Sequence, residues 1–478
     1  MTSHECQVSL KKVHPIDQKS SLCDDIAPIR HLHIGQGIRP SKKGCVCTRL
    51  VCNQEILIMD KTTAFRIIKV DRMIDGTGKA IMPKAEILMK DGEIAEVGPQ
   101  GSLSKPSDAF VEETDYGNRT VLPGLVDCHV HLNGIGDGRS GDELALLPDE
   151  ILTVQAAVNA KKHLDSGVTT VRDCGGKHNT TFLLRQSVEM GIVEAPRLIL
   201  AGRPIAIIGG HLGYFGTQAT GEAECRAAVR QLVKEGADFI KITATGGSTK
   251  TSFPMRPSFT VDELTTICDE AHKFGKHTVA HCTSSEGMLN AIQSGIDTIV
   301  HGVHKEPDGT NLYRPEITEQ IIEHGIYVNP TLNIARVEGQ RLQTKMDKHG
   351  LNSFEQNQLK TIREERQVRM EHVNRMRESG VTLVCGSDSA WGHYKMGDFQ
   401  GEIESTVLSG MPPEDAIVSA TLNSARSCNY DDKVGSIEPG KKADLVIVDG
   451  NPGKNIEDLR RIVTVFKDGE KINRNNSI

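Results

Sequence analysis

Long apolar runs, a block of basic residues and a regular cysteine spacing are all missing from this chain of 478 residues. No stretch of about 18 apolar residues occurs, so we expect no segment to span a membrane. The formal net charge of −7, without a basic block, argues against nucleic acid as the main partner. Aromatic residues make up only 4% of the chain, and Trp391 is its single tryptophan. The remaining composition, 37% hydrophobic and 25% charged, is typical of a globular protein.

The twelve cysteines show no disulfide framework spacing, which favours reduced thiols and a cytoplasmic location. The N-terminal segment also lacks the apolar core of a secretory signal. Cys45-Val-Cys47 with Cys52 suggests a metal site, but residues 1–63 carry no sustained periodicity. Incidental cysteines in a poorly ordered extension are therefore the favoured interpretation.

Short strands separated by turns are predicted near both ends of the rest of the chain. The strand-like runs begin at Arg66, Ala85, Glu93, Ala443 and Arg461, and Asp-Gly turns stand at Asp91 and Asp468. We predict that residues 64–124 and 431–478 pair into one small β-sandwich domain.

Strands and helices alternate between these ends, over residues 125–430. Eight candidate strands end near His131, Asp173, Ala201, Lys241, His281, His301, Pro330 and Asp388. Glycines stand where helix C-caps are expected, just before strands, at Gly167, Gly236, Gly275, Gly295, Gly325 and Gly380. Eight such units predict an α/β fold of the (β/α)₈ TIM-barrel type. A charged insertion at 337–379 indicates exposed helix.

Five of the candidate strands end in side chains that bind divalent metals. A parallel barrel brings the carboxyl ends of its strands to one mouth, so ligands far apart in sequence converge there. His129 and His131 point to the same side of an extended strand, and both can reach one ion. His281 and His301 end successive strands, roughly 5 Å apart, and suit a second ion. Asp388 ends the last strand, which in a closed barrel lies beside the first, so its carboxylate reaches the first ion.

Lys241 is the exception in this set, because two dications would repel a protonated ammonium group. Carbamylation by CO₂ would convert Lys241 into a carboxylate that bridges both ions. A pair of divalent ions shares a water, lowers its pKa towards 7 and polarises a carbonyl oxygen. Asp388 is then placed to take the proton from that water and pass it to the leaving group.

Each of these residues also has an ordinary explanation when taken alone. A histidine at a strand end is usually hydrogen-bonded, a lysine is usually solvated, and Asp388 could be a helix N-cap. The coincidence at five strand ends favours the metal site. His277, at a strand start, is interpreted as structural, and for His304, in a loop, exposure to solvent is favoured over a contact at the rim.

Two segments resemble signatures of the amidohydrolase superfamily. Residues 121–131 read Val-Leu-Pro-Gly-Leu-Val-Asp-Cys-His-Val-His and look like its first-strand motif, and residues 435–449 are similar to its C-terminal β-sandwich motif. The segment Lys241-Ile-Thr-Ala-Thr-Gly-Gly-Ser places the chain near the imidazolonepropionase-like and prolidase-like members. The resemblance covers about residues 64–470 and implies a hydrolase with two zinc-type ions, a carboxylated Lys241 between them and a tendency to form homo-oligomers.

Another segment, at residues 208–214, resembles the same subgroup and predicts substrate contacts. Its glycines let backbone approach a ligand closely, and His211 or Tyr214 could bind a substrate carbonyl or carboxylate. A solvent-facing histidine in a glycine-rich loop is an equal alternative. Further candidates are Arg172 and Arg203 for a substrate carboxylate, Thr331 at the mouth, and Trp391, which could stack on a substrate or simply pack.

The predicted activity is cleavage of an amide in a small molecule, such as a dipeptide, an N-acyl amino acid or a xenobiotic amide. The alternative on the same site is hydrolysis of a cyclic amide, lactone or other ester. Ring deamination is disfavoured, because deaminases on this barrel generally use one metal and lack a bridging lysine. A non-catalytic homologue should have lost ligands, whereas all six positions are filled here. Zinc is expected first, although histidine and carboxylate ligands also accept manganese, iron or cobalt.

Overall fold

The computed structural model describes residues 65–107 and 109–474. The predicted extension at 1–63, including Cys45, Cys47 and Cys52, lies outside the described residues. None of the described helices combines the length and the hydropathy that crossing a bilayer requires.

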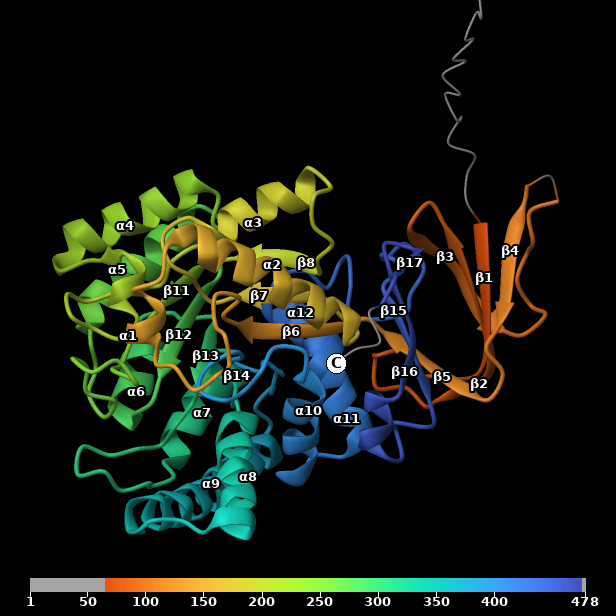
Figure 1. Cartoon of the computed structure of the whole chain (residues 1–478). Helices are drawn as coiled ribbons and strands as arrows, with labels where there is room; N and C mark the ends of the chain where they lie inside the picture. The colour runs from red at the N-terminus through yellow and green to blue at the C-terminus, as the bar shows by residue number, and fades with distance from the viewer. Residues whose placement is uncertain (1–64, 108, 475–478) are drawn as a thin grey trace, which may run out of the picture. The chain divides into compact units, whose positions relative to one another are not determined.

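Strands from both ends of the chain form one eight-stranded sheet (Figure 1). Its order is β17-β16-β15-β5-β1-β2-β3, and β4 pairs with β1. The strands are β1 (Phe65–Met73), β2 (Met82–Lys90), β3 (Glu93–Pro99), β4 (Val111–Asp115), β5 (Arg119–Pro123), β15 (Leu445–Asp449), β16 (Ile462–Lys467) and β17 (Glu470–Lys471). The two ends meet where β15 runs antiparallel to β5. The hydrogen bonds thus assemble a single sheet here, and not the two sheets of the expected sandwich.

The predicted Asp-Gly turns connect β2 to β3 and β16 to β17. Asp91 and Gly92 both have positive φ angles, of 51° and 85°, and Asp468 and Gly469 have 48° and 75°. Positive φ at both central residues matches the right-handed twist of the flanking strands, and Asp-Gly adopts it readily. The prediction of these two hairpins is therefore confirmed.

The middle of the chain folds into two parallel sheets. The first contains β6 (Leu125–Val130), β7 (Val168–Asp173) and β8 (Arg197–Leu200), in that order. The second has the order β10-β9-β11-β12-β13-β14, built from β9 (Ile205–Ala206), β10 (Thr217–Gln218), β11 (Ile240–Ile242), β12 (Thr278–Cys282), β13 (Thr298–His301) and β14 (Tyr327–Asn329). An α/β architecture with parallel strands is thus present, and seven of the eight predicted strand ends coincide with the end of a strand to within two residues.

The eighth predicted strand, ending at Asp388, is not a regular strand. The segment 382–389 makes one parallel bridge to β14, between Val328 and Leu383, and one to β6, between Val130 and Ser389. Backbone hydrogen bonds join it to both strands, since Val384 N donates to Val328 O and Asp388 N to His129 O. Between these two contacts the pairing is irregular, because Ser387 N donates to the side-chain Oδ1 of Asp127. This segment therefore touches an edge strand of each parallel sheet without forming a continuous closed barrel with them.

Helices follow most of the parallel strands. They are α1 (Gly141–Leu144), α2 (Asp149–Asp165), α3 (Thr180–Glu189), η1 (Gly213–Phe215), α4 (Gly221–Glu235), α5 (Val261–Lys273), α6 (Ser285–Gln293), α7 (Pro315–Glu323), α8 (Asn333–His349), α9 (Ser353–Ser379), α10 (Phe399–Leu408), α11 (Pro413–Val418), η2 (Ser419–Asn423), α12 (Ser424–Ser427) and η3 (Ile456–Arg460). All six glycines predicted to end helices have positive φ angles, between 65° and 105°. That conformation is the usual helix stop and is nearly free of strain only for glycine.

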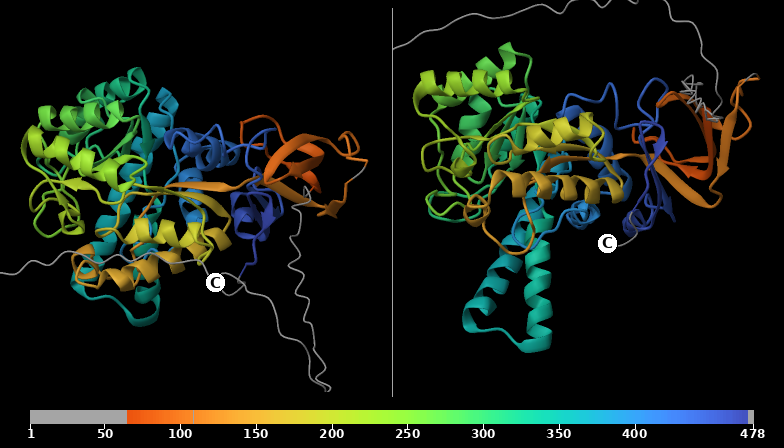
Figure 2. Two further views of the ribbon diagram at one scale, coloured as in Figure 1. Left: turned by 90° about the horizontal axis from the view of Figure 1, so that it is seen from above. Right: turned by 45° about the horizontal axis from the view of Figure 1, so that its top comes forward.

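The charged insertion forms the antiparallel pair α8 and α9, which extends away from the parallel sheets in the right-hand view of Figure 2. Exposed helix was predicted here, but the pair is exposed only in part, since Leu342, Leu359, Val373 and Met376 are buried.

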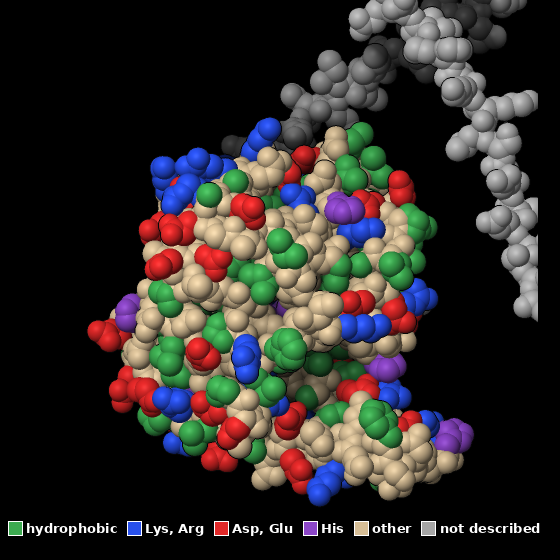
Figure 3. Space-filling model, turned by 90° about the vertical axis from the view of Figure 1, so that its left-hand side faces the viewer, with side chains coloured by type: hydrophobic (Ala, Val, Ile, Leu, Met, Phe, Trp, Pro, Cys, Tyr) green, Lys and Arg blue, Asp and Glu red, His purple; other side chains and the backbone are tan. Residues whose placement is uncertain are grey.

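On the face shown in Figure 3, acidic and basic side chains are interspersed.

Candidate active site

The four histidines predicted at strand ends lie against one another. His129 ends β6 together with His131, and their ring centroids are 5.4 Å apart. His281 in β12 and His301 at the end of β13 are 4.4 Å apart, and His129 is 5.6 Å from His301. Three separate strands therefore deliver four imidazoles to one place.

Asp388 and Lys241 complete this cluster. Asp388 Oδ1 lies 3.4 Å from His129 Nε2 and 3.5 Å from His131 Nε2, and its Oδ2 lies 4.0 Å from His301 Nε2. Lys241 Nζ is 3.3 Å from His129 Nε2, which is its one hydrogen-bonding neighbour among the described residues. The carboxylate thus stands between the two histidine pairs, and the buried amine has no carboxylate bound to it.

In each of the four histidines, one ring nitrogen lies within hydrogen-bonding distance of an oxygen atom of the surrounding structure. His131 Nδ1 donates to Gly175 O at 2.7 Å and His281 Nε2 donates to Gly246 O at 3.0 Å. Because a carbonyl can only accept, the other nitrogen of each neutral ring carries a free lone pair.

The remaining two rings are held by side chains. His129 Nδ1 lies 3.1 Å from Asn329 Oδ1, and His301 Nδ1 lies 2.8 Å from Thr331 Oγ1. The amide of Asn329 donates to Gly386 O, so its oxygen faces the histidine as an acceptor. Partners of this kind orient histidines that bind metals.

Burial keeps these imidazoles neutral. It lowers the pKa of His131 to about 3, and it holds the pKa of His129, His281 and His301 well below the usual value. Burial also raises the pKa of Asp388 to about 7, because the carboxylate loses its hydration. Neutral imidazole is the form that binds metal, and a cation beside Asp388 would favour its ionised form.

The donor atoms fit a divalent ion. Atoms bound about 2.0 Å from a tetrahedral ion lie roughly 3.3 Å from one another, close to the observed 3.4 and 3.5 Å from Asp388 to His129 and His131. One ligand atom from each of these three residues lies within 4.8 Å of the others. His281 and His301 present a second pair of free nitrogens beside them.

The backbone at the cluster is strained at three positions. His301, Thr331 and Asp388 have φ angles of 69°, 50° and 54°, in the left-handed region that residues with a side chain rarely adopt. Such conformations persist where the surrounding structure fixes them, and they concentrate at functional sites.

The segment carrying Asp388 is fixed against β6 by close packing and by a buried carboxylate. A Cβ at Gly386 would lie 2.6 Å from that of His129, so glycine is needed for this approach. Asp127 accepts hydrogen bonds from the backbone and hydroxyl of Ser387, from His129 N and from His163 Nε2. The positions of His129 and Asp388 are therefore coupled through Asp127.

The cluster opens into a cavity of about 650 Å³. In Figure 3, which looks onto the left-hand side of Figure 1, the surface is hollowed. The candidate substrate residues that line the cavity are His211, Tyr214, Thr331 and Trp391. The rings of His211 and His281 are tilted by 45° with centroids 4.5 Å apart, and the ring centroid of Trp391 lies 5.0 Å from that of His131. Trp391 thus forms a wall of the cavity next to the candidate metal ligands.

Two arginines considered for a substrate carboxylate lie elsewhere. Arg172 is buried, donates to Cys128 O and Ser427 O, and packs over Phe239. Arg203 pairs with Glu235. Neither side chain lines the cavity beside the histidines, so the structure does not support these two predictions.

The prediction of solvent exposure for His304 was also wrong. His304 is buried and lies 4.9 Å from the ring of Tyr313, and its Nδ1 accepts a hydrogen bond from Arg314 N. His277 does not line the cavity, in agreement with the structural role expected for it.

Sequence reasoning missed Arg369, which reaches the cavity from α9. The helix lies in the charged insertion, where nothing distinguishes Arg369 from its many basic neighbours. Its position at the cavity follows only from the way α9 packs, which the sequence pattern does not indicate.

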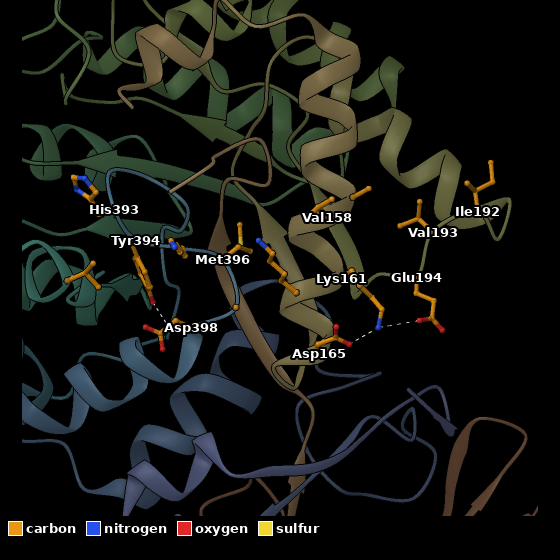
Figure 4. A pocket seen from close by; sticks show the side chains of 15 residues that line it. Val158, Lys161, Asp165, Ile192, Val193, Glu194, His393, Tyr394, Met396 and Asp398 are labelled. Carbon is orange, nitrogen blue, oxygen red and sulfur yellow. Dashed lines mark hydrogen bonds and ion pairs between the residues drawn. The ribbon is translucent and has the colours of Figure 1, made fainter. Parts of the chain in front are cut away.

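A second cavity of about 960 Å³ lies between α2 and the segment His393–Asp398 (Figure 4). Its walls include Val158, Ile192 and Val193, and Lys161 there is paired with Asp165 and Glu194. None of the six candidate metal ligands lines it. The reactive groups are thus gathered in the smaller cavity.

Parallel β/α units that carry a candidate metal site at their strand ends are compatible with a metal-dependent hydrolase. This chain belongs to the amidohydrolase family, whose sequence profile matches residues 120–472. It is accordingly a hydrolase, of a family that is generally metal-dependent.

Individual relatives support the same assignment. The solved structure of a Xaa-Pro dipeptidase with methionine bound in its active site is 30% identical, with a TM-score of 0.72, over 86% of this chain and 100% of that one. Ochratoxinase of Aspergillus niger is 24% identical over 442 residues, which are 84% of this chain and 86% of that protein. Imidazolonepropionase of Rhizobium rhizogenes is 23% identical over 402 residues, 77% of this chain and 88% of that protein.

Proposed function

We propose that the protein is a binuclear-metal amidohydrolase that cleaves an amide bond in a small molecule. The observation that carries the proposal is the set of four neutral histidines, three buried and His301 partly buried, each oriented by one hydrogen bond, around Asp388 and Lys241. The substrate class is a dipeptide, an N-acyl amino acid or an amide xenobiotic, by analogy with relatives named for a dipeptide and for ochratoxin.

In this proposal His129, His131 and Asp388 would hold one ion, and His281 and His301 would hold the other. Lys241 would carry a carboxylate formed with CO₂ and would serve as a ligand shared by both. Support comes from the amine of Lys241, which is 1% exposed and has no acid bound to it in its unmodified form. A buried cation beside two dications would be strongly unfavourable, whereas a carboxylate there is stabilised.

Two bound divalent ions supply activation of water and polarisation of the amide carbonyl. The residues of the chain do the rest. Asp388 accepts the proton of the attacking water and delivers it to the amide nitrogen as the C–N bond breaks. His211 and Tyr214 orient the substrate from the loop between β9 and β10, and Trp391 packs against its side chain.

We also propose that segment 382–389 completes a (β/α)₈ barrel, with residues 125–430 as its domain and residues 64–124 with 431–478 as the second. The bridges from this segment to β14 and β6 support closure. The alternative function is hydrolysis of a cyclic amide, lactone or other ester, which the similarity to a protein named imidazolonepropionase favours.

The test is a mass-spectrometric screen of the purified, metal-supplemented protein against Xaa-Pro dipeptides, N-acyl amino acids and aryl amides. Asp388→Asn should lower kcat by about 10²- to 10⁴-fold, since a proton-transfer group contributes that much. The matched control is Asp347→Asn, at an exposed position on α8, which should keep full activity. Residual activity of Asp388→Asn within a few-fold of wild type would refute its role, and cleavage of lactones alone would favour the alternative.

A further inference from the structure

Arg369 is held at the cavity by backbone carbonyls. Its Nη2 donates to His301 O at 2.9 Å and also to Pro330 O. These two carbonyls end the β13 and β14 region beside the candidate metal ligands, so the guanidinium is fixed next to His301.

The charge of Arg369 is unpaired within the described parts of the chain. Arg336 and Arg341 in the neighbouring helix α8 each pair with a glutamate, Glu404 and Glu338, but no ion pair forms at Arg369. Its Nε is buried without a hydrogen-bond partner, and a guanidinium is a cation at neutral pH.

The other charged groups that line the cavity do not serve as its partner. Arg139 pairs with Asp137, and Glu143 accepts from the Ser140 backbone as part of a helix capping box. Asp388 lies among the histidines. A guanidinium with an unpartnered Nε and no carboxylate paired with it among these residues therefore lines a cavity of ligand size.

We propose that Arg369 binds a carboxylate of the substrate, so that the preferred substrates are amides of amino acids with a free carboxylate. This inference rests on the proposed amidase function and specifies its substrate class. A guanidinium forms two parallel hydrogen bonds to a carboxylate, which gives orientation as well as affinity.

A purely structural role is the competing explanation, because Arg369 also links the ends of two strands. The two roles differ in one observable. A structural link affects all substrates alike, whereas a carboxylate contact affects only substrates that carry the carboxylate.

The experiment compares two acids with their neutral counterparts. N-acetyl-L-phenylalanine and N-acetyl-L-proline are each paired with the N-acetyl amine that lacks only the carboxylate. Binding to the metal-supplemented full chain is measured by calorimetry in the Asp388→Asn variant, which prevents turnover, and kcat/KM is measured with Asp388 present.

With Arg369 in place, at least one acid should bind about 10- to 100-fold more tightly than its neutral counterpart. Arg369→Met should abolish this preference, and Arg369→Lys should keep part of it. Arg366→Met is the matched control, since Arg366 lies one turn earlier on α9 and lines a different groove, and it should keep the preference in full.

Equal binding of acid and neutral compound with Arg369 present would overturn the proposal without any variant. A preference that survives in Arg369→Met, or equal weakening of both compounds, would overturn it as well. Cleavage of the amides without an Arg369-dependent preference for the acid would refute the carboxylate contact but support the amidase function. Arg369-dependent binding of the acid, without cleavage of any amide in the panel, would support the anion subsite and refute the amidase function.

Discussion

At the scale of single residues, the candidate site depends on which ring nitrogen each histidine leaves free. His129, His131 and His301 are held through Nδ1 and present Nε2, whereas His281 is held through Nε2 and presents Nδ1. A histidine at the end of a strand therefore needs a specific acceptor nearby, and the identity of that acceptor decides its tautomer.

Lys241 provides the sharpest prediction at this scale. Lys241→Ala should lose at least about 10²-fold in activity, because it removes the proposed bridging carboxylate and a second-ion ligand. Short-chain carboxylic acids such as formate or acetate should restore part of the activity by occupying the vacated space. Kinetics with and without added acid measure this, and metal content is determined in parallel.

Lys276→Ala is the matched control, since Lys276 precedes β12 and does not line the cavity. It should keep full activity and show no response to acids. An unmodified amine at Lys241 in a metal-loaded, active sample, seen by crystallography or carbon NMR, would contradict the bridge.

The six candidate metal ligands found from the sequence share one property. Each of them stands at the end of an apolar run, so the position of the strand also gave the position of the ligand. Arg369 belongs to a helix, and its place at the cavity depends on how α9 packs, which no local pattern encodes. The acceptors Gly175 O and Gly246 O are backbone atoms. Any residue type has a backbone carbonyl, so the sequence does not indicate these hydrogen bonds.

At the scale of elements, the segment 382–389 differs most from expectation. Its hydrophobic residues predicted a strand, and it does form backbone hydrogen bonds to β14 and β6, but Ser387 N between them is bonded to the side chain of Asp127. Polar side chains that compete with backbone partners cannot be recognised from periodicity, because they act across distant parts of the chain. The hairpin turns and helix ends were predictable because glycine and Asp-Gly determine them locally.

Asp127→Asn tests whether this segment depends on the buried carboxylate. Four donors converge on the two oxygens of Asp127, and an amide would replace one acceptor by a donor. Leaving buried donors unsatisfied costs about 1–3 kcal/mol, so the free energy of unfolding should fall by that amount. Urea titration measures it, and activity should fall as well, because Ser387 adjoins Asp388. The exposed Asp347→Asn should change neither, and an unchanged unfolding midpoint in Asp127→Asn would contradict the coupling.

At the scale of the whole molecule, the sheet built from both chain ends connects distant sequence. β15 pairs with β5, which leads within two residues into β6 and its histidines. The end of the chain therefore supports the strand that enters the candidate site. The resemblance of residues 121–131 and 435–449 to family signatures, noted from the sequence, corresponds to these neighbouring elements.

The last prediction concerns where the folded unit begins. The described elements belong to the unit Asp60–Ile478, and the described strand partners of β1 lie between Met82 and Val121. Deleting residues 1–59 should therefore change the thermal midpoint by less than about 2 °C and leave kcat/KM unchanged. A longer deletion through Met73 is the control, because it removes β1 from the sheet between β2 and β5 and should prevent folding. Thermal unfolding followed by circular dichroism distinguishes them, and failure of the shorter deletion to fold would show that the first 59 residues contribute to the stable unit.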